Sequence, residues 1–191
     1  MNFETIISIC LGIGLSASVG FRVFLPLFAL SLASYFNVWE LNASWQWVGS
    51  TTAVIVLGVA TIVEIFAYFI PYVDNLLDSI AVPLAALAGT AVMLSTVSEL
   101  SPVITWALAI IAGGGTAAAI SGTTSTTRLA STTTTGGITN PIFSTIETGT
   151  ATLMSIISIF LPSLAIVLVI IMVCVIFKLY KKFRTRKVKN I

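Results

Sequence analysis

Long apolar stretches that are almost free of charge constrain the fold of this chain most strongly. Residues 6–36 contain a single charged residue, Arg22. As a helix at about 1.5 Å per residue, this stretch would be longer than the ~30 Å hydrocarbon core of a bilayer requires. Only 8% of all residues are charged and 57% are hydrophobic, whereas soluble domains carry about 25% charged residues. Because so few charges cannot cover a surface in water, the solvent must be a lipid bilayer.

The apolar stretches predict an all-α polytopic integral membrane protein with five to six transmembrane helices. The clearest spans are expected at about 6–36, 48–70, 79–97, 103–115 and 150–177. At about 20 residues per span, 191 residues leave no room for a separate soluble domain. Residues 1–177 are therefore expected to form a single transmembrane domain. The chain start has no basic n-region, so the first stretch is expected to be a retained span.

Prolines predict that some of these helices are broken or re-entrant, around Pro26, Pro71 and Pro141. Pro26 removes a helical hydrogen bond to the carbonyl of Arg22, so a kink or break is expected near Arg22. Irregular backbone at membrane depth is tolerated only where it is buried in protein or lines a cavity. We therefore expect functional residues beside these breaks.

Residues 113–150 are dominated by Gly, Thr, Ser and Ala. One interpretation is a low-complexity linker. The segment lacks the Glu, Lys and Gln of a disordered tether, however, and threonine hydroxyls can bond back to helix carbonyls. A polar intramembrane element is favoured over a linker, and the sequence leaves open whether the segment is helical.

Seven of the nine basic residues lie in the last fourteen positions. They are Lys178, Lys181, Lys182, Arg184, Arg186, Lys187 and Lys189. Basic residues beside a span usually mark the cytoplasmic side. Residues 178–191 are therefore expected to form a basic cytoplasmic tail. Five spans would place the N-terminus outside and six would place it inside, and the sequence leaves both open.

The other two basic residues, Arg22 and Arg128, are isolated in long uncharged stretches. Arginine stays protonated, and insertion scales place it about 2.5–3.5 kcal/mol uphill at the bilayer centre, so each needs a partner. One interpretation is a structural ion pair with an acid. The available acids are Glu64, Asp74, Asp78 and Glu147. The other interpretation is a site for a phosphate or carboxylate beside the free amides of a broken helix.

Several polar residues beside the expected breaks have two interpretations each. Asp74 and Asp78 are four residues apart and share a helix face, which suits proton or cation handling. Asp74 suits an N-terminal helix cap even better, and Asp78 equally suits a solvated interface. Glu147 follows Asn140 and Ser144, where it would also complement a helix dipole. The Asn140 amide suits either a helix cap or a ligand to a substrate or ion.

The residue types exclude or disfavour several functional classes. The chain has no histidine, which excludes histidine-based acid–base catalysis. Two distant cysteines, Cys10 and Cys174, do not supply the usual ligands of zinc or most transition metals. We therefore expect no enzymatic activity, no metal and no cofactor. Nucleic-acid binding is not expected either, because the single basic cluster adjoins a span.

Several motifs are spread along nearly the whole chain. They are Gly14-Leu-Ser-Ala-Ser-Val-Gly20 before Phe24-Leu-Pro26-Leu, Ile70-Pro-Tyr-Val-Asp74-Asn-Leu-Leu-Asp78, Gly113-Gly-Gly-Thr, Thr127-Arg128, and Asn140-Pro141-Ile-Phe-Ser144-Thr-Ile-Glu147. Together they resemble the bacterial membrane family of domain of unknown function 4126 (DUF4126). The resemblance implies a bacterial cytoplasmic (inner) membrane location but no particular activity. It also implies that seven residues occupy family motif positions: Asp74, Asp78, Arg128, Asn140, Pro141, Ser144 and Glu147.

The chain departs from the family pattern in two places. Members often carry a histidine and a lysine between the Gly-rich run and the arginine, where this chain has only Ser, Gly and Thr. An acidic residue that often follows the motif glutamate is Thr148 here. These departures lower the local charge and weaken a proton-relay role for that segment.

Ionisable residues beside expected helix breaks predict a small membrane transporter or channel with a polar intramembrane site for an anionic or ionic solute. The expected pathway residues are Arg22, Arg128, Asp74, Asp78, Asn140, Ser144, Glu147 and Glu64. Expected partners are the lipid bilayer, an anionic small solute or a lipid phosphate, and further copies of the chain if it forms a homo-oligomer. The alternative is a non-transporting membrane scaffold whose buried charge pairs are structural. An intramembrane enzyme would need acids from different helices converging on a lipid-accessible cleft.

Overall fold

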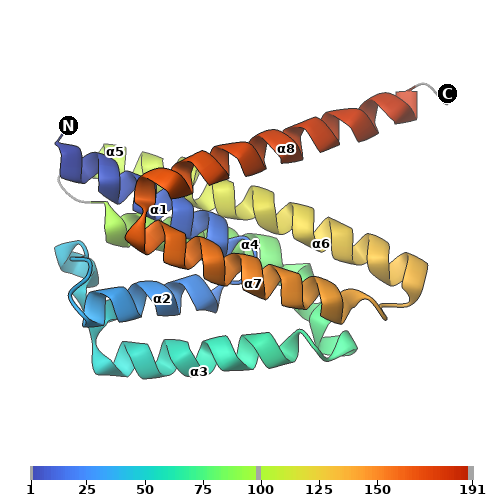
Figure 1. Ribbon diagram of the computed structural model, residues 1–191, viewed down its shortest axis with the longest axis horizontal. Coiled ribbons are helices and arrows are strands. Elements are labelled where there is room, and N and C mark those ends of the chain that lie inside the picture. The colour runs from blue at the N-terminus through green and yellow to red at the C-terminus, as the bar shows by residue number, and fades with distance from the viewer. Residues whose placement is uncertain (1, 98–99, 189–191) are drawn as a thin grey trace.

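The computed structural model describes residues 2–97 and 100–188, and this part of the chain is all-α. Eight α-helices, one 3₁₀ segment (η1) and one π-helical segment (η2) make up the described part. They are α1 (Phe3–Val19), α2 (Phe24–Tyr35), η1 (Ala43–Gly49), α3 (Thr51–Ala67), α4 (Pro71–Thr96), α5 (Pro102–Leu108), η2 (Ala109–Gly114), α6 (Gly115–Thr135), α7 (Asn140–Phe160) and α8 (Pro162–Val188). The helices run roughly along one direction, and the start of α1 and the end of α8 lie at opposite ends of the molecule (Figure 1).

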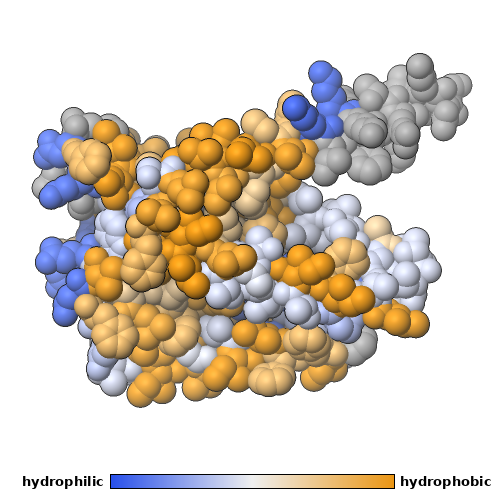
Figure 2. All heavy atoms as spheres, viewed as in Figure 1, coloured by the Kyte–Doolittle hydropathy of each residue, from blue (hydrophilic) through white to orange (hydrophobic). Residues whose placement is uncertain are grey.

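Several helices are long and apolar enough to cross a membrane. Within the described residues there are three, or four if η1 and α3, bent by 65°, count as one span. The three are Tyr72–Thr96, Pro102–Thr135 and Asn140–Phe160, and α1, α2 and Pro162–Lys178 are shorter apolar helices. Apolar side chains spread over the outer surface of α3, α7 and α8 (Figure 2). These are the features of a multi-pass membrane protein, as the low charge of the sequence predicts.

The chain reverses direction between α1 and α2, and the break expected near Arg22 is present. The break covers residues 20–23, and α2 then runs back alongside α1 (Figure 1). Leu15 of α1 and Leu30 of α2 belong to one buried core. Pro26 lies in the first turn of α2, where proline is tolerated because its missing N–H has no helical partner there. The break therefore precedes the proline, and α1 and α2 form a helical hairpin with Arg22 at its tip.

Most of the other prolines lie at helix starts, whereas Pro83 lies inside α4. Pro71 is the first residue of α4 and Pro141 the second of α7. The single last span predicted over residues 150–177 is wrong, because Leu161 is non-helical and separates α7 from α8. Pro162 begins α8, since it has no N–H to continue the preceding helix. The chain reverses at this point (Figure 1).

The Thr-rich segment is helical, which decides between the two interpretations. α6 and α7 cover most of it, and a turn at Gly136 and Gly137, with φ of +64° and +85°, joins them. Thr hydroxyls donate to carbonyls one turn earlier, for example from Thr123 to Ala119 at 2.8 Å. These bonds satisfy the hydroxyl groups inside an apolar solvent. The segment is therefore part of the helical bundle.

Glycines let α4 approach the α5–η2–α6 helix closely. A Cβ added at Gly89 would lie 2.6 Å from the Cβ of Ala117 and 2.8 Å from the carbonyl oxygen of Gly113. Both distances are shorter than a real Cβ contact, and one neighbour is backbone that cannot rotate away. Small residues of this kind allow close backbone packing between helices in membranes.

We expect Gly89→Ala to lower the midpoint of thermal unfolding in detergent. Overpacking of this kind costs about 1–3 kcal/mol. Gly149→Ala is the matched control, because a Cβ at Gly149 has no atom within 4 Å. Alanine there should be neutral or stabilising by up to about 1 kcal/mol through helix propensity. Equal midpoints for the two variants would contradict the close contact at Gly89.

Candidate functional site

Two buried arginines from different parts of the fold meet at the ring of Tyr68. Arg22 lies at the hairpin tip and Arg128 in α6, and each is 1% exposed. Their Cζ atoms lie 3.9 Å and 4.6 Å from the Tyr68 ring centroid, respectively. An aromatic ring attracts a guanidinium group through its quadrupole. Sequence reasoning missed Tyr68, although it follows Glu64 by one helical turn at the end of α3.

Glu147 of α7 is a counter-ion shared by both arginines. Its Oε2 atom lies 3.3 Å from Nη1 of Arg22 and 3.4 Å from Nε of Arg128. Two guanidinium groups this close would repel each other, and the carboxylate between them offsets that repulsion. Glu147 thereby joins the hairpin tip, α6 and α7.

Asp74 and Asp78 of α4 both face Arg128. Nη1 of Arg128 donates to Oδ1 of Asp74 and lies 3.7 Å from Oδ1 of Asp78. The other oxygen of Asp74 accepts a hydrogen bond from Nδ2 of Asn140 at 2.8 Å. The helix-cap interpretation of Asp74 is wrong: the N-cap residue of α4 is Ile70, and no side chain caps the helix. Asp78 is the less engaged acid, because its side chain is 17% exposed and its contact is longer.

Arg22 uses all three of its nitrogen atoms. Nε donates to Oγ1 of Thr148 at 3.0 Å, and Nη2 donates to the hydroxyl and the carbonyl of Ser144 at 2.7 and 3.0 Å. Nη1 donates to the carbonyl of Phe21 at 3.3 Å and pairs with Glu147. Thr148 was noted in the sequence only as a residue that lowers the local charge. In the fold it is a neutral hydrogen-bond acceptor for Arg22.

Arg128 and Asn140 keep hydrogen-bonding capacity that the described residues do not use. Nη2 and Nε of Arg128 make no hydrogen bond there, although Nε is within ion-pair distance of Glu147. Oδ1 of Asn140 accepts none, while its Nδ2 donates to Asp74 and to Thr132. Asn140 is only 2% exposed. Buried donors and acceptors of this kind are usually satisfied by water or a ligand.

Glu64 has a role that the sequence did not indicate. Its two oxygens accept hydrogen bonds from the backbone amides of Val23 at 2.7 Å and Phe24 at 3.0 Å. These are free amides at the start of α2, where a carboxylate also complements the helix dipole. The protein's own carboxylate therefore occupies the broken-helix amides, which one of the two interpretations of the sequence assigned to an external anion.

We call Arg22, Arg128, Asp74, Asp78 and Glu147 the charge cluster. With every group ionised, its three carboxylates and two guanidinium groups leave one excess negative charge. One proton or one monovalent cation would balance it. No three acidic or cysteine side chains among the described residues are placed to hold a metal ion. Of the other predicted residues, Ser144 and Asn140 bind the cluster directly and Glu64 lies beside it.

A polar groove between α4 and α6 reaches the charge cluster. Its volume is about 480 Å³, and it is lined by Asn75, Asp78, Ser79, Ser125, Thr126, Leu129 and Thr132. Asp78 belongs to the cluster, and Thr132 accepts a hydrogen bond from Asn140 at 3.0 Å. The groove is therefore continuous with the polar groups around Asp74.

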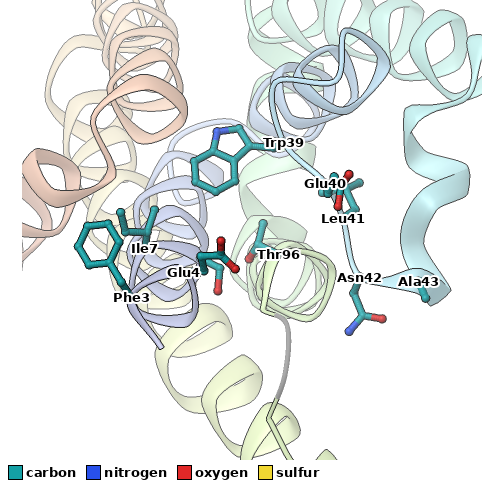
Figure 3. A pocket seen from close by; sticks show the side chains of 10 residues that line it. Phe3, Glu4, Ile7, Trp39, Glu40, Leu41, Asn42, Ala43 and Thr96 are labelled. Carbon is teal, nitrogen blue, oxygen red and sulfur yellow. The ribbon is translucent and has the colours of Figure 1, made fainter. Parts of the chain in front are cut away.

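A larger hollow lies at the other end of α4 and does not include the predicted site residues. Its volume is about 780 Å³, and its lining comes from the start of α1, the loop before η1 and the end of α4. Figure 3 shows Glu4, Trp39 and Thr96 around this space. Glu4 and Glu40 there are exposed. This hollow is separate from the charge cluster, which lies near the start of α4.

Comparisons with known proteins identify a family for most of the helical bundle. No curated protein and no solved structure matches the chain. The family model described as "Domain of unknown function (DUF4126)" matches residues 9–182, which contain the entire charge cluster. The matched segment is most of the chain and confirms the resemblance seen in the motifs. The chain therefore belongs to the DUF4126 family.

Proposed function

We propose that the protein is a small membrane transporter whose charge cluster binds and releases a cation, with a proton as the first candidate. The observation that carries this proposal is the excess carboxylate of the cluster. Asp78 is its least engaged member, at 3.7 Å from Arg128 and 17% exposed. Ionisable groups within membrane spans usually face the bundle interior or a water-filled cavity, and they mark ion and proton pathways. Asp78 is then the group that exchanges the ion.

The proposal includes a membrane arrangement of five crossing segments and one re-entrant hairpin. The crossing segments are α3, α4, α5–η2–α6, α7 and α8, and the hairpin is α1–α2. The hairpin tip packs halfway along Pro102–Thr135, because a Cβ at Gly20 would lie 2.6 Å from the Cβ of Ile120. A tip at this depth supports an arrangement in which α1 enters the membrane and α2 returns to the same side.

The orientation follows from the basic C-terminal segment. α8 continues through Val188, so most of the basic residues extend the last helix, and Lys189 lies outside the described residues. With this segment in the cytoplasm of a bacterial inner membrane, five crossings place the start of α1 on the opposite side. The charge cluster then lies in the cytoplasmic half of the protein.

The contacts favour a cation over the anionic solute or lipid phosphate that the sequence predicts. Carboxylates engage both arginines, and Glu64 occupies the free amides of α2. An anion would have to displace one of these carboxylates. A cation would instead offset their excess charge, and a proton on Asp78 would cost only the longest ion pair of the cluster, at 3.7 Å from Arg128.

Flux through reconstituted protein tests the proposal. Liposomes that contain the protein and a pH-sensitive dye are expected to dissipate an imposed proton gradient faster than empty liposomes. Asp78→Asn should slow this flux by at least about tenfold, since a positioned proton-transfer group typically contributes 10²–10⁴-fold. Glu40→Gln removes an exposed carboxylate outside the cluster and should leave the flux unchanged. Sodium and potassium gradients identify the ion if protons do not move, and folded protein that moves none of the three rejects the proposal.

A non-transporting membrane scaffold is the second candidate, and the complete pairing of Arg22 favours it. All three nitrogens of this arginine have partners within the protein. In a scaffold the charge cluster only holds the hairpin, α4, α6 and α7 together. Folded protein without flux of any tested ion, combined with strong destabilisation by cluster substitutions, would support this role instead.

A further inference from the structure

The polar groove between α4 and α6 reaches the charge cluster at Asp78. We propose that it is the aqueous entrance of the charge cluster, through which Asp78 exchanges its ion with water. This inference rests on the proposed function for the identity of the ion. The hydration of the groove is a separate property, and it can be measured without any transport.

The lining of the groove differs from the neighbouring surface of the same helix. Asp78 and Ser79 of α4 and Ser125 and Thr126 of α6 line the groove. The hydroxyls of Ser79 and Thr126 donate to carbonyls of their own helices. On the same turns of α4, Leu76 is an exposed apolar residue. The Asp78 carboxylate and the unbonded Ser125 hydroxyl are the lining groups that hydrocarbon cannot satisfy, and each unsatisfied group costs free energy. We therefore expect water to fill the groove and lipid to cover Leu76.

Unused hydrogen-bonding groups continue the polar path behind the groove. Oγ of Ser125 is buried in its lining and makes no hydrogen bond within the described residues. Further in, Nη2 of Arg128 is an unused donor and Oδ1 of Asn140 an unused acceptor. Both side chains bind Asp74, and both are at least 98% buried. Water both donates and accepts, so it suits a site that presents one group of each kind.

Two contacts connect the groove to these buried groups. Asp78, in the groove wall, lies 3.7 Å from Nη1 of Arg128. Thr132, also in the wall, accepts from Nδ2 of Asn140 at 3.0 Å. The groove occupies the first turns of α4 and the last turns of α6, towards the end where α8 carries the basic residues (Figure 1). In the proposed orientation it opens to the cytoplasm.

Cysteine labelling in membrane vesicles tests the entrance. The two native cysteines, Cys10 and Cys174, are free and are first replaced by alanine. Ser125→Cys and Ser79→Cys then report on the groove, and Leu76→Cys is the matched control at the same depth. In inside-out vesicles, a cationic membrane-impermeant methanethiosulfonate should modify both groove cysteines at least about tenfold faster than the control, because the thiolate forms in water and not in lipid. Right-side-out vesicles should show little reaction.

The charge of the groove gives a second readout. The cationic reagent should react faster than an anionic reagent of the same size, because Asp78 attracts it. Adding Asp78→Asn should remove most of this preference while the cysteine stays accessible. If Ser125→Cys does not fold, the more exposed Ser79→Cys carries the same comparison.

Two results would overturn the proposal that the groove is an aqueous entrance. One is reaction of the groove cysteines no faster than the Leu76→Cys control. The other is reaction with an apolar maleimide alone, which would show that lipid covers the groove. Proton flux together with an unreactive groove places the entrance elsewhere and leaves the proposed function intact. A reactive groove without flux confirms the hydration of the groove and rejects transport.

Discussion

Replacing Arg128 with methionine is expected to destabilise the protein severely. The substitution leaves the fully buried Asp74 carboxylate without a cation and removes one of the two partners of Glu147. Removing one member of a buried ion pair costs about 3–5 kcal/mol, a large part of the roughly 5–15 kcal/mol that stabilises a typical domain. Thermal unfolding in detergent, followed by size-exclusion chromatography, measures the loss. Thr127→Met, an exposed neighbour on α6, controls for the methionine itself.

A double variant separates the lost charge pair from a general packing defect. Adding Asp74→Asn to Arg128→Met removes the uncompensated carboxylate, and part of the stability should return. Residues in direct contact show coupling energies of about 0.5–3 kcal/mol. If the two losses simply add, the Arg128–Asp74 contact does not contribute as an ion pair.

Glu147→Gln is expected to produce the second large effect. Asp74 and Asp78 still pair with Arg128, but Arg22 loses its one acidic partner within 4 Å among the described residues. The cost should again be about 3–5 kcal/mol, because a buried charge is left uncompensated. The loss is expected even though the net charge of the cluster moves to zero, since local pairing outweighs the total charge at these distances.

Added anions should partly restore this variant and leave the wild type unchanged. Chloride or inorganic phosphate could take the place of the lost carboxylate beside Arg22, and a ligand at 100 times its Kd contributes about 2.7 kcal/mol. The readout is the unfolding midpoint across an anion titration at constant ionic strength. A comparable shift in wild type would contradict our conclusion that its arginines are already occupied.

The sequence predicts the members of the candidate site better than their geometry. Isolated charges in apolar stretches are rare, so Arg22, Arg128, Asp74, Asp78 and Glu147 stood out individually. Their meeting depends on how α4, α6, α7 and the hairpin pack. That packing is set by glycines and small residues whose partners are far away in sequence, such as Gly89 against Ala117. Periodicity along one helix contains no information on such partners.

Other predictions were wrong, and some residues were missed, because the same local sequence pattern is compatible with more than one structure. Asp74 fits a helix-start pattern, but Arg128 and Asn140 compete successfully for its carboxylate. Pro162 lies in a long apolar run, where a kinked span and a reversal between two helices look the same. The residues next to Tyr68 in the sequence do not distinguish it from other aromatic residues. Its contact with two guanidinium groups exists only in the folded bundle.

The contacts of the hairpin tip determine when the N-terminal segment can complete its folding during synthesis. Arg22 donates hydrogen bonds to Ser144 and Thr148, which the ribosome adds 122 and 126 residues later. In the proposed membrane arrangement, Arg22 without these partners would cost up to the roughly 2.5–3.5 kcal/mol of an arginine at the bilayer centre until α7 emerges. The first-made hairpin can therefore settle at its full depth only after most of the chain has been translated. A nascent chain that stops before α7 therefore lacks the hydrogen-bond acceptors and the carboxylate that α7 supplies to Arg22.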